Sequence, residues 1–314
     1  MPWPRDDAKL DRVRAAMEEV ELDALVVRAP DNVLYLTNLW GMKGYEAVVF
    51  PREGEPTTFT AAWFEGFGDA IDATPLLNAV RTIKTPQELE RIRIANEIAA
   101  AAMEHARHEL RSGMSESEAA ALWQGHVHGQ GTNREDVDLA LAFSLVWSGS
   151  GIKTFTATGD GPVREDEPTL FEIWVCADGY WCDHTKNLCP GELSSEYAAL
   201  ERDLLSVYEA LLGLCRPGQS LAELDRSARE AIASLGYPGQ PTHPLCHGVG
   251  ARAHEPPYAH QAGGGAIAEG MVLAIEPGIY WEGGGGLRVE DNFLVTAEGP
   301  EKLSSFPDGI VRAG

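Results

Sequence analysis

Hydrophobic positions alternate between a helical and a strand period over the first part of the chain. Residues 7–20 have the spacing of an amphipathic helix, residues 24–27 form a short apolar run, and residues 33–36 fit a second strand or a short helix. Two further apolar runs, 47–50 and 56–60, flank a polar turn and predict a hairpin. Residues 63–77 lack a clear period. We therefore expect a small α/β domain over residues 1–78 and a larger domain over 79–314.

The larger domain begins with helices and continues with strands. Thr85 and Glu88 form a capping box before a helix over 86–108, and Ser115 and Glu118 form another. An apolar run at 137–148, a glycine-spaced loop and a strand near Leu170 follow, then helices over 195–214 and 221–235. This order predicts an α+β fold in which helices cover one face of a curved, mostly antiparallel sheet. The other face is available for a site.

The sharpest local geometry lies in residues 171–188, where Asp178-Gly179 separates two apolar runs as a two-residue hairpin turn. This turn sets Glu172 opposite Thr185 and Trp174 opposite Asp183. The Glu172 and Asp183 carboxylates then share one face as diagonal neighbours, roughly 7 Å apart. Two like charges at that distance require a cation or a shared proton.

Three further polar residues, His247, Glu276 and Glu290, lie in apolar strand-like segments. Glu276 and Glu290 flank a hairpin around the glycines at 283–286, and they share a face only if its loop has an odd length, which the glycine run leaves open. The glycines precede a strand rather than a helix, which argues against a phosphate site. With the hairpin carboxylates, the chain offers one imidazole and four carboxylates, a ligand set that suits two divalent cations.

Composition restricts the class of protein. A chain of 314 residues with 44% hydrophobic content can bury a large core, and a net charge of -23 without basic clusters argues against nucleic-acid partners. The sequence shows neither a secretory signal nor an apolar run long enough to span a membrane, so we expect a cytoplasmic protein without a membrane partner. The five cysteines include no Cys-x-x-Cys pair, which favours reduced thiols.

Four segments together resemble the metallopeptidases of the creatinase, prolidase and methionine aminopeptidase group, whose catalytic domain has the pita-bread fold. They occur in the family's order and are Gly179-Tyr180-Trp181-Cys182-Asp183-His184-Thr185-Lys186, His243-Pro244-Leu245-Cys246-His247-Gly248-Val249-Gly250 with His254-Glu255-Pro256-Pro257, Val272-Leu273-Ala274-Ile275-Glu276-Pro277-Gly278-Ile279-Tyr280, and Leu287-Arg288-Val289-Glu290-Asp291. Residues 32–37 resemble the N-terminal domain of prolidases and creatinases, in a shortened form. The resemblance is strongest to Xaa-Pro dipeptidases.

The resemblance implies a role for each matching position. Asp183 and Glu290 would bridge two metals, His247 and Glu276 would complete one site, and Glu172 the other. Glu276 would also accept a proton from the attacking water. His254 and His243 would hydrogen-bond the substrate and the developing oxyanion, while Arg288 and Tyr280 would act behind the ligands or bind a substrate carboxylate.

Two departures from the family pattern affect this interpretation. Glu172 stands where the family usually has aspartate, which lengthens the ligand by about 1.5 Å, and Lys186 replaces an arginine. We expect two divalent ions, Mn, Co or Zn, in a homodimeric enzyme that hydrolyses short peptides such as Xaa-Pro dipeptides. The alternatives are a creatinase-like hydrolase of a small amide or amidine, and a binding module without catalysis.

Overall fold

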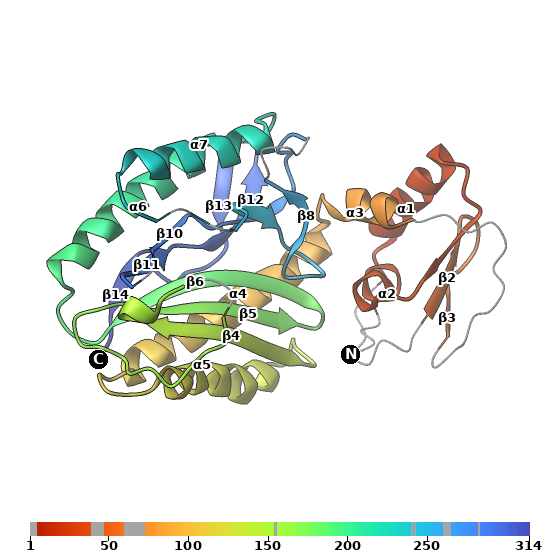
Figure 1. Ribbon diagram of the computed structural model, residues 1–314. Helices are drawn as coiled ribbons and strands as arrows, with labels where there is room; N and C mark the ends of the chain where they lie inside the picture. The colour runs from red at the N-terminus through yellow and green to blue at the C-terminus, as the bar shows by residue number, and fades with distance from the viewer. Residues whose placement is uncertain are drawn as a thin grey trace.

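The computed structural model describes residues 5–38, 47–59, 73–153, 156–239, 241, 243–259, 265–281 and 283–314. Its N-terminal body combines three helices with a small antiparallel sheet of order β1-β2-β3 (Figure 1). Residues 33–36, which fit either a strand or a helix by pattern, are helical and buried. The elements are α1 (Asp7–Glu19), β1 (Ala24–Val27), α2 (Pro30–Thr37), β2 (Ala47–Pro51), β3 (Thr57–Phe59) and α3 (Thr74–Arg81).

Helix α3 contains Asn78, the residue near which the sequence pattern divides the chain. Leu77 is buried in the apolar cluster that α1, α2 and the β1–β2 strands share, and Val80 packs against the same cluster. The chain then leaves the N-terminal body after Arg81, and the four residues 82–85 connect it to the long helix α4. We propose that residues 82–85 form the boundary between the two domains.

The larger body has the expected order of a helix pair, strands, a second helix pair and strands. The helices and short 3-10 turns are α4 (Pro86–Glu109), α5 (Glu116–Gln130), η1 (Gly131–Asn133), η2 (Gly149–Gly151), α6 (Ser195–Leu214) and α7 (Leu221–Ser234). The strands are β4 (Ala140–Ser148), β5 (Thr169–Ala177), β6 (Tyr180–Cys189), β7 (Cys246–Gly248), β8 (Glu255–Tyr258), β9 (Val272–Ile275), β10 (Gly278–Trp281), β11 (Gly285–Arg288), β12 (Asp291–Thr296), β13 (Gly299–Lys302) and β14 (Ile310–Arg312).

Helices lie outside and strands inside, as Figure 1 shows. One apolar cluster joins α4 and α5 to the four-stranded sheet β14-β6-β5-β4, and another joins α6 and α7 to the five-stranded sheet β13-β12-β9-β7-β8 and the β10-β11 ribbon. Among the described strands, every pairing is antiparallel except that of β14 with β6. Among the described residues, an isolated β-bridge pairs Thr185 of β6 with Glu290 of the other half. The mixed α+β architecture predicted from the sequence is confirmed.

Local signals in the sequence explain how these elements begin and turn. Both predicted capping boxes are present, at Thr85 with Glu88 and at Ser115 with Glu118. The β5–β6 hairpin turns at Asp178 and Gly179, which have φ angles of 49° and 95° and so adopt the left-handed conformation that a tight two-residue turn requires. No helix in the described part of the chain is long and apolar enough to span a membrane.

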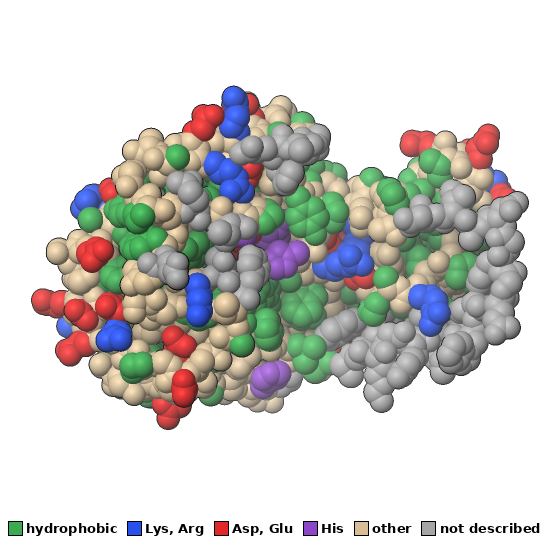
Figure 2. All heavy atoms as spheres, in the orientation of Figure 1, with side chains coloured by type: hydrophobic (Ala, Val, Ile, Leu, Met, Phe, Trp, Pro, Cys, Tyr) green, Lys and Arg blue, Asp and Glu red, His purple; other side chains and the backbone are tan. Residues whose placement is uncertain are grey.

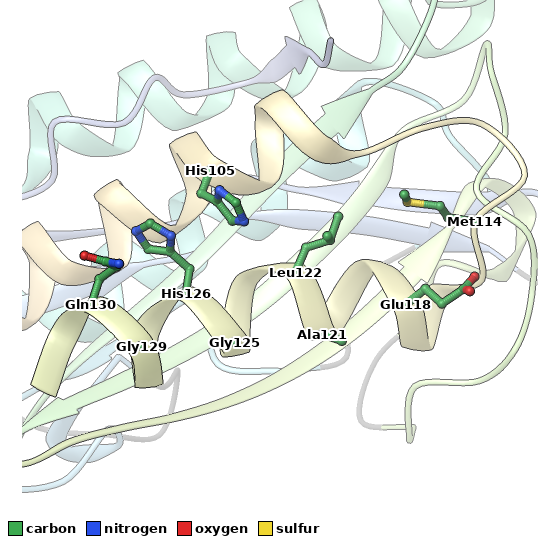
Figure 3. Close-up of a pocket in the computed structure, with 9 residues that line it drawn as sticks. All are labelled: His105, Met114, Glu118, Ala121, Leu122, Gly125, His126, Gly129 and Gln130. Atoms are coloured by element: carbon green, nitrogen blue, oxygen red, sulfur yellow. The ribbon is translucent and has the colours of Figure 1, made fainter.

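A hollow of about 620 Å³ lies between α4 and α5 (Figure 3). Its lining includes His105 and His126, whose rings stack at 4.6 Å between centroids. Both side chains are half-buried. None of the nine lining residues belongs to the carboxylate set predicted to bind metal.

Candidate metal centre

The β5–β6 hairpin supplies the first two carboxylates. Its register pairs Glu172 with Thr185 and Trp174 with Asp183, as predicted from the position of the turn. Glu172 and Asp183 therefore project from the same face of the sheet. Both are buried, at 4% and 1% exposure.

The C-terminal half supplies the histidine and the other two carboxylates. His247 lies on β7, Glu276 follows β9, and Glu290 precedes β12. The β10–β11 pairing of Gly278 with Arg288 and the β9–β12 pairing of Ile275 with Asp291 continue one register, which sets Glu276 opposite Glu290. The loop between β10 and β11 has three residues, so the odd length that the sequence left open is present.

These side chains converge on the His247 imidazole. His247 Nε2 lies 3.3 Å from Glu276 Oε1, 3.6 Å from Asp183 Oδ2 and 3.9 Å from Glu290 Oε1. His254 Nε2 lies 3.2 Å from the same Asp183 oxygen. Within the described part of the chain, two overlapping trios of possible ligand atoms result, Asp183–His247–His254 and His247–Glu276–Glu290, each within 4.8 Å. They bring together five residues from distant parts of the sequence.

Unpartnered buried atoms show that this set fits a divalent cation. Among the described residues, Asp183 Oδ2 and His247 Nε2 are buried without a hydrogen-bond partner. A buried polar atom in that state costs free energy unless something else satisfies it. Carboxylate oxygens with an imidazole nitrogen are the donors that Mn, Co and Zn accept.

The charges of the cluster are poorly compensated by the protein. Burial, followed by repulsion from Glu276, raises the pKa of Glu290 to about 8. Burial and then Glu290 raise the pKa of Asp183 well above its usual value. Burial would also raise the pKa of Glu276, but the neighbouring His243 and His247 lower it below its ordinary value. A cation between the two trios would neutralise these charges.

Glu172 contacts Arg288 and stands outside both trios. Arg288 Nη2 lies 2.5 Å from Glu172 Oε2, its Nε donates to Thr185 Oγ1 at 2.6 Å, and its Nη1 donates to the Tyr280 hydroxyl at 2.9 Å. Arg288 is only 1% exposed. The guanidinium thus pairs with Glu172 and hydrogen-bonds to Thr185 and Tyr280 within the buried interior.

A chain of hydrogen bonds runs from Arg288 to Glu276. The Tyr280 hydroxyl lies 3.1 Å from His243 Nε2, and His243 Nδ1 lies 3.1 Å from Glu276 Oε2. Because His243 Nδ1 also faces the Pro244 carbonyl at 2.8 Å, that nitrogen is the donor and Nε2 accepts from Tyr280. His243 is buried and orients Glu276 from the protein side.

Sequence reasoning missed a second group of buried polar residues behind the ligands. Asp291 is fully buried and accepts from Lys186 Nζ at 2.5 Å, with Lys302 Nζ at 3.1 Å. Asn292 holds the backbone of Asp183 through two hydrogen bonds, of 3.0 Å and 2.8 Å. The adjacent polar pair Asp291-Asn292 within an apolar strand was the signal that could have identified them.

Aromatic residues line the approach to the ligands. Phe143 is 53% exposed and stacks on Trp174 at 5.2 Å, and Trp174 lies 6.1 Å from the His254 ring. Tyr258 is 42% exposed and lies 6.5 Å from His247. Figure 2 shows histidine side chains at the surface in the middle of the molecule, near hydrophobic side chains and a group of Lys and Arg side chains. Aromatic side chains thus border both histidines of the cluster.

Comparisons with known proteins agree with this geometry. The family model of metallopeptidase family M24 matches residues 90–297, and that of the creatinase/prolidase N-terminal domain matches residues 9–66. A putative dipeptidase of Bacillus subtilis is 28% identical over 78% of this chain and 67% of its own length. An uncharacterised peptidase of Staphylococcus aureus is 31% identical over 76% of this chain and 66% of its own length. The matched regions thus span about two thirds of these relatives.

Solved structures share the fold over nearly the whole chain. A prolidase from Thermococcus sibiricus superposes with a TM-score of 0.83 at 20% identity, covering 99% of this chain and 100% of that one. An X-Pro aminopeptidase from Thermotoga maritima superposes with a TM-score of 0.80 at 21% identity, covering 95% and 100%. The clustered ligand set, the fold and the family match over two thirds of the residues lead to one conclusion: this chain belongs to metallopeptidase family M24.

Proposed function

We propose that this protein is a metal-dependent peptidase that cleaves short peptides, with Xaa-Pro dipeptides as its first candidate substrates. The convergence of Asp183, Glu276 and Glu290 on His247 carries the proposal, because three buried carboxylates around one imidazole require a compensating cation. The names of the relatives and structural neighbours support the substrate class.

We propose two divalent ions, held by Asp183, His247, Glu276, Glu290 and Glu172, with His254 beside them. Bound metal ions lower the pKa of a coordinated water and polarise a carbonyl, which is the chemistry that peptide hydrolysis needs at neutral pH. Glu172 would have to share its carboxylate between a metal and Arg288. We propose manganese, cobalt or zinc as the metals, in a cytoplasmic homodimer.

Three residues of the chain have roles in moving protons and orienting the substrate. Glu276 has a lowered pKa, so it is ionised at neutral pH and can accept a proton from the attacking water. His243 holds the second Glu276 oxygen and so fixes the direction of that acceptor. Burial, and then the neighbouring His247, lowers the pKa of His254 to about 4, so at neutral pH this half-exposed imidazole is neutral and can donate a hydrogen bond to the substrate.

The direct test is hydrolysis of a peptide panel by metal-stripped protein with and without added Mn²⁺, Co²⁺ or Zn²⁺. The panel holds Xaa-Pro dipeptides, matched dipeptides without proline, and tripeptides with proline second, and the products are identified by mass. Metal-dependent release from the Xaa-Pro dipeptides is expected, and Glu276→Gln should slow it strongly. Absence of turnover for every peptide with every metal would refute the peptidase proposal and favour a small-amide hydrolase or a binding module.

A further inference from the structure

The segment that carries His254 is anchored on both sides by the N-terminal body. Before His254, Arg252 forms a two-point ion pair with Asp31 of α2, with Nε 2.7 Å from Oδ2 and Nη2 3.0 Å from Oδ1. After it, Glu255 accepts from Lys84 Nζ at 2.9 Å and pairs with Arg81. The imidazole that faces the metal cluster therefore stands between two electrostatic anchors.

The two anchors are parts of one buried network. Arg81 contacts Asp31 and Glu255 and also donates to Asn32 Oδ1 at 2.7 Å, so one guanidinium links both sides. Arg81 and Glu255 are 2% exposed and Asp31 is 8% exposed. Charge pairs that are withdrawn from water depend strongly on geometry, because displacing one partner leaves the other buried and uncompensated. The network therefore resists displacement of the segment.

Apolar contacts connect the same surfaces. Leu34 of α2 belongs to one buried cluster with Tyr180, Val249 and Ala251. Leu34 also reaches the turn of the β5–β6 hairpin, where a methyl group added at Gly179 would lie 2.4 Å from its Cδ2 atom. Helix α2 thus contacts both the hairpin that presents Asp183 and the segment that presents His254.

We propose that Arg252 and Asp31 are positioning residues that hold His254 at its 3.2 Å contact with Asp183. Backbone hydrogen bonds fix the segment at Val249 and Gly250, and the Arg252 and Glu255 side chains anchor it on either side of His254. The effect on catalysis rests on the proposed peptidase function, whereas the anchoring itself does not. The N-terminal body therefore contributes to catalysis by fixing the position of the segment that carries His254.

The test compares Arg252→Met with Arg93→Met in the full-length protein. Arg252 has a 45% exposed side chain, and Arg81 still pairs with Asp31 when Arg252 is replaced, so we expect the variant to fold. Arg93 forms an exposed ion pair with Glu301 at 2.8 Å outside the site, which makes it a matched control. Hydrogen exchange of the peptides that cover residues 249–259 reports the anchoring without any need for turnover.

We expect hydrogen exchange in residues 249–259 to be faster in Arg252→Met than in the native protein. In Arg93→Met the exchange rate of these residues should be unchanged. With a cleaved peptide, we expect kcat to fall about 10- to 100-fold while KM changes less than about two-fold, since a displacement of about 1 Å can cost that much in rate. Arg252→Lys should recover part of the loss. In a His254→Ala background, Arg252→Met should have no further effect on kcat, because the imidazole that Arg252 positions is already absent.

Each outcome has a distinct meaning. Unchanged exchange in Arg252→Met would refute the anchoring. Faster exchange with unchanged kcat, or equal loss of kcat in the presence and absence of His254, would refute the positioning role. If the native protein cleaves no peptide at all, the proposed function fails, and the exchange measurement alone decides whether the N-terminal body anchors this segment.

Discussion

The metal-free protein should lose stability as the pH rises from about 5 to about 8. Burial and Glu276 raise the pKa of Glu290 to about 8 from an ordinary value of 4.5. Between these two values the folded state binds a proton that the unfolded state has released, so unfolding becomes easier as the pH rises. The raised pKa of Asp183 and that of His247 act in the same direction.

The magnitude follows from the Glu290 shift. A difference of about 3.5 pKa units corresponds to roughly 5 kcal/mol of folding free energy across the window from about 4.5 to about 8, at 1.36 kcal/mol per unit. The lowered pKa of Glu276 has the opposite sign, but its contribution is lost only as the pH falls below about 4.5, so it does not enter this window. Saturating Mn²⁺ should remove most of the slope, because a cation stabilises the ionised carboxylates.

Urea denaturation of chelator-treated protein between pH 5 and pH 8, repeated with Mn²⁺, measures this effect. Glu290→Gln should flatten the metal-free profile, since its neutral amide replaces the carboxylic acid. Glu301→Gln, at an exposed position of β13, serves as the control and should leave the slope unchanged. A metal-free stability that stays constant or rises over this window, or a slope that Mn²⁺ does not alter, would refute the charge assignment of the cluster.

Three further predictions concern single side chains. Glu276→Gln should lower kcat about 10²- to 10⁴-fold at saturating metal, and a normal rate in steady-state assays would exclude Glu276 as proton acceptor. Phe143→Ala should raise KM about ten-fold for substrates with large apolar residues and leave kcat unchanged, which a substrate series measures. Gly179→Ala should lower the free energy of unfolding by about 2–4 kcal/mol, as measured by urea denaturation. The loss should exceed that of Gly113→Ala. Both glycines have a positive φ, but only at Gly179 does the added methyl group meet a neighbour, Leu34 Cδ2, within 4 Å.

The sequence determined most of the local structure around the centre. Capping boxes and the Asp178-Gly179 turn act over a few residues, so they place helix starts and one hairpin register without the rest of the fold. The same reasoning placed Glu172 and Asp183 on one face. Polar residues in apolar strand-like segments nominated His247, Glu276 and Glu290 as ligands. Their individual roles depended on resemblance to a known family, because no local pattern relates His247 to the β5–β6 hairpin.

Only the tertiary structure decided how these pieces combine. The Glu276–Glu290 register depended on the loop between β10 and β11, and the partner of Glu172 depended on where Arg288 packs. The contact of α2 with the His254 segment joins residues 221 positions apart, a separation at which periodicity carries no information. Backbone hydrogen bonds and turn geometry are short-range, so they can be read along the chain. A buried charge is compensated by residues from distant segments, and only the complete fold determines which of these segments become neighbours.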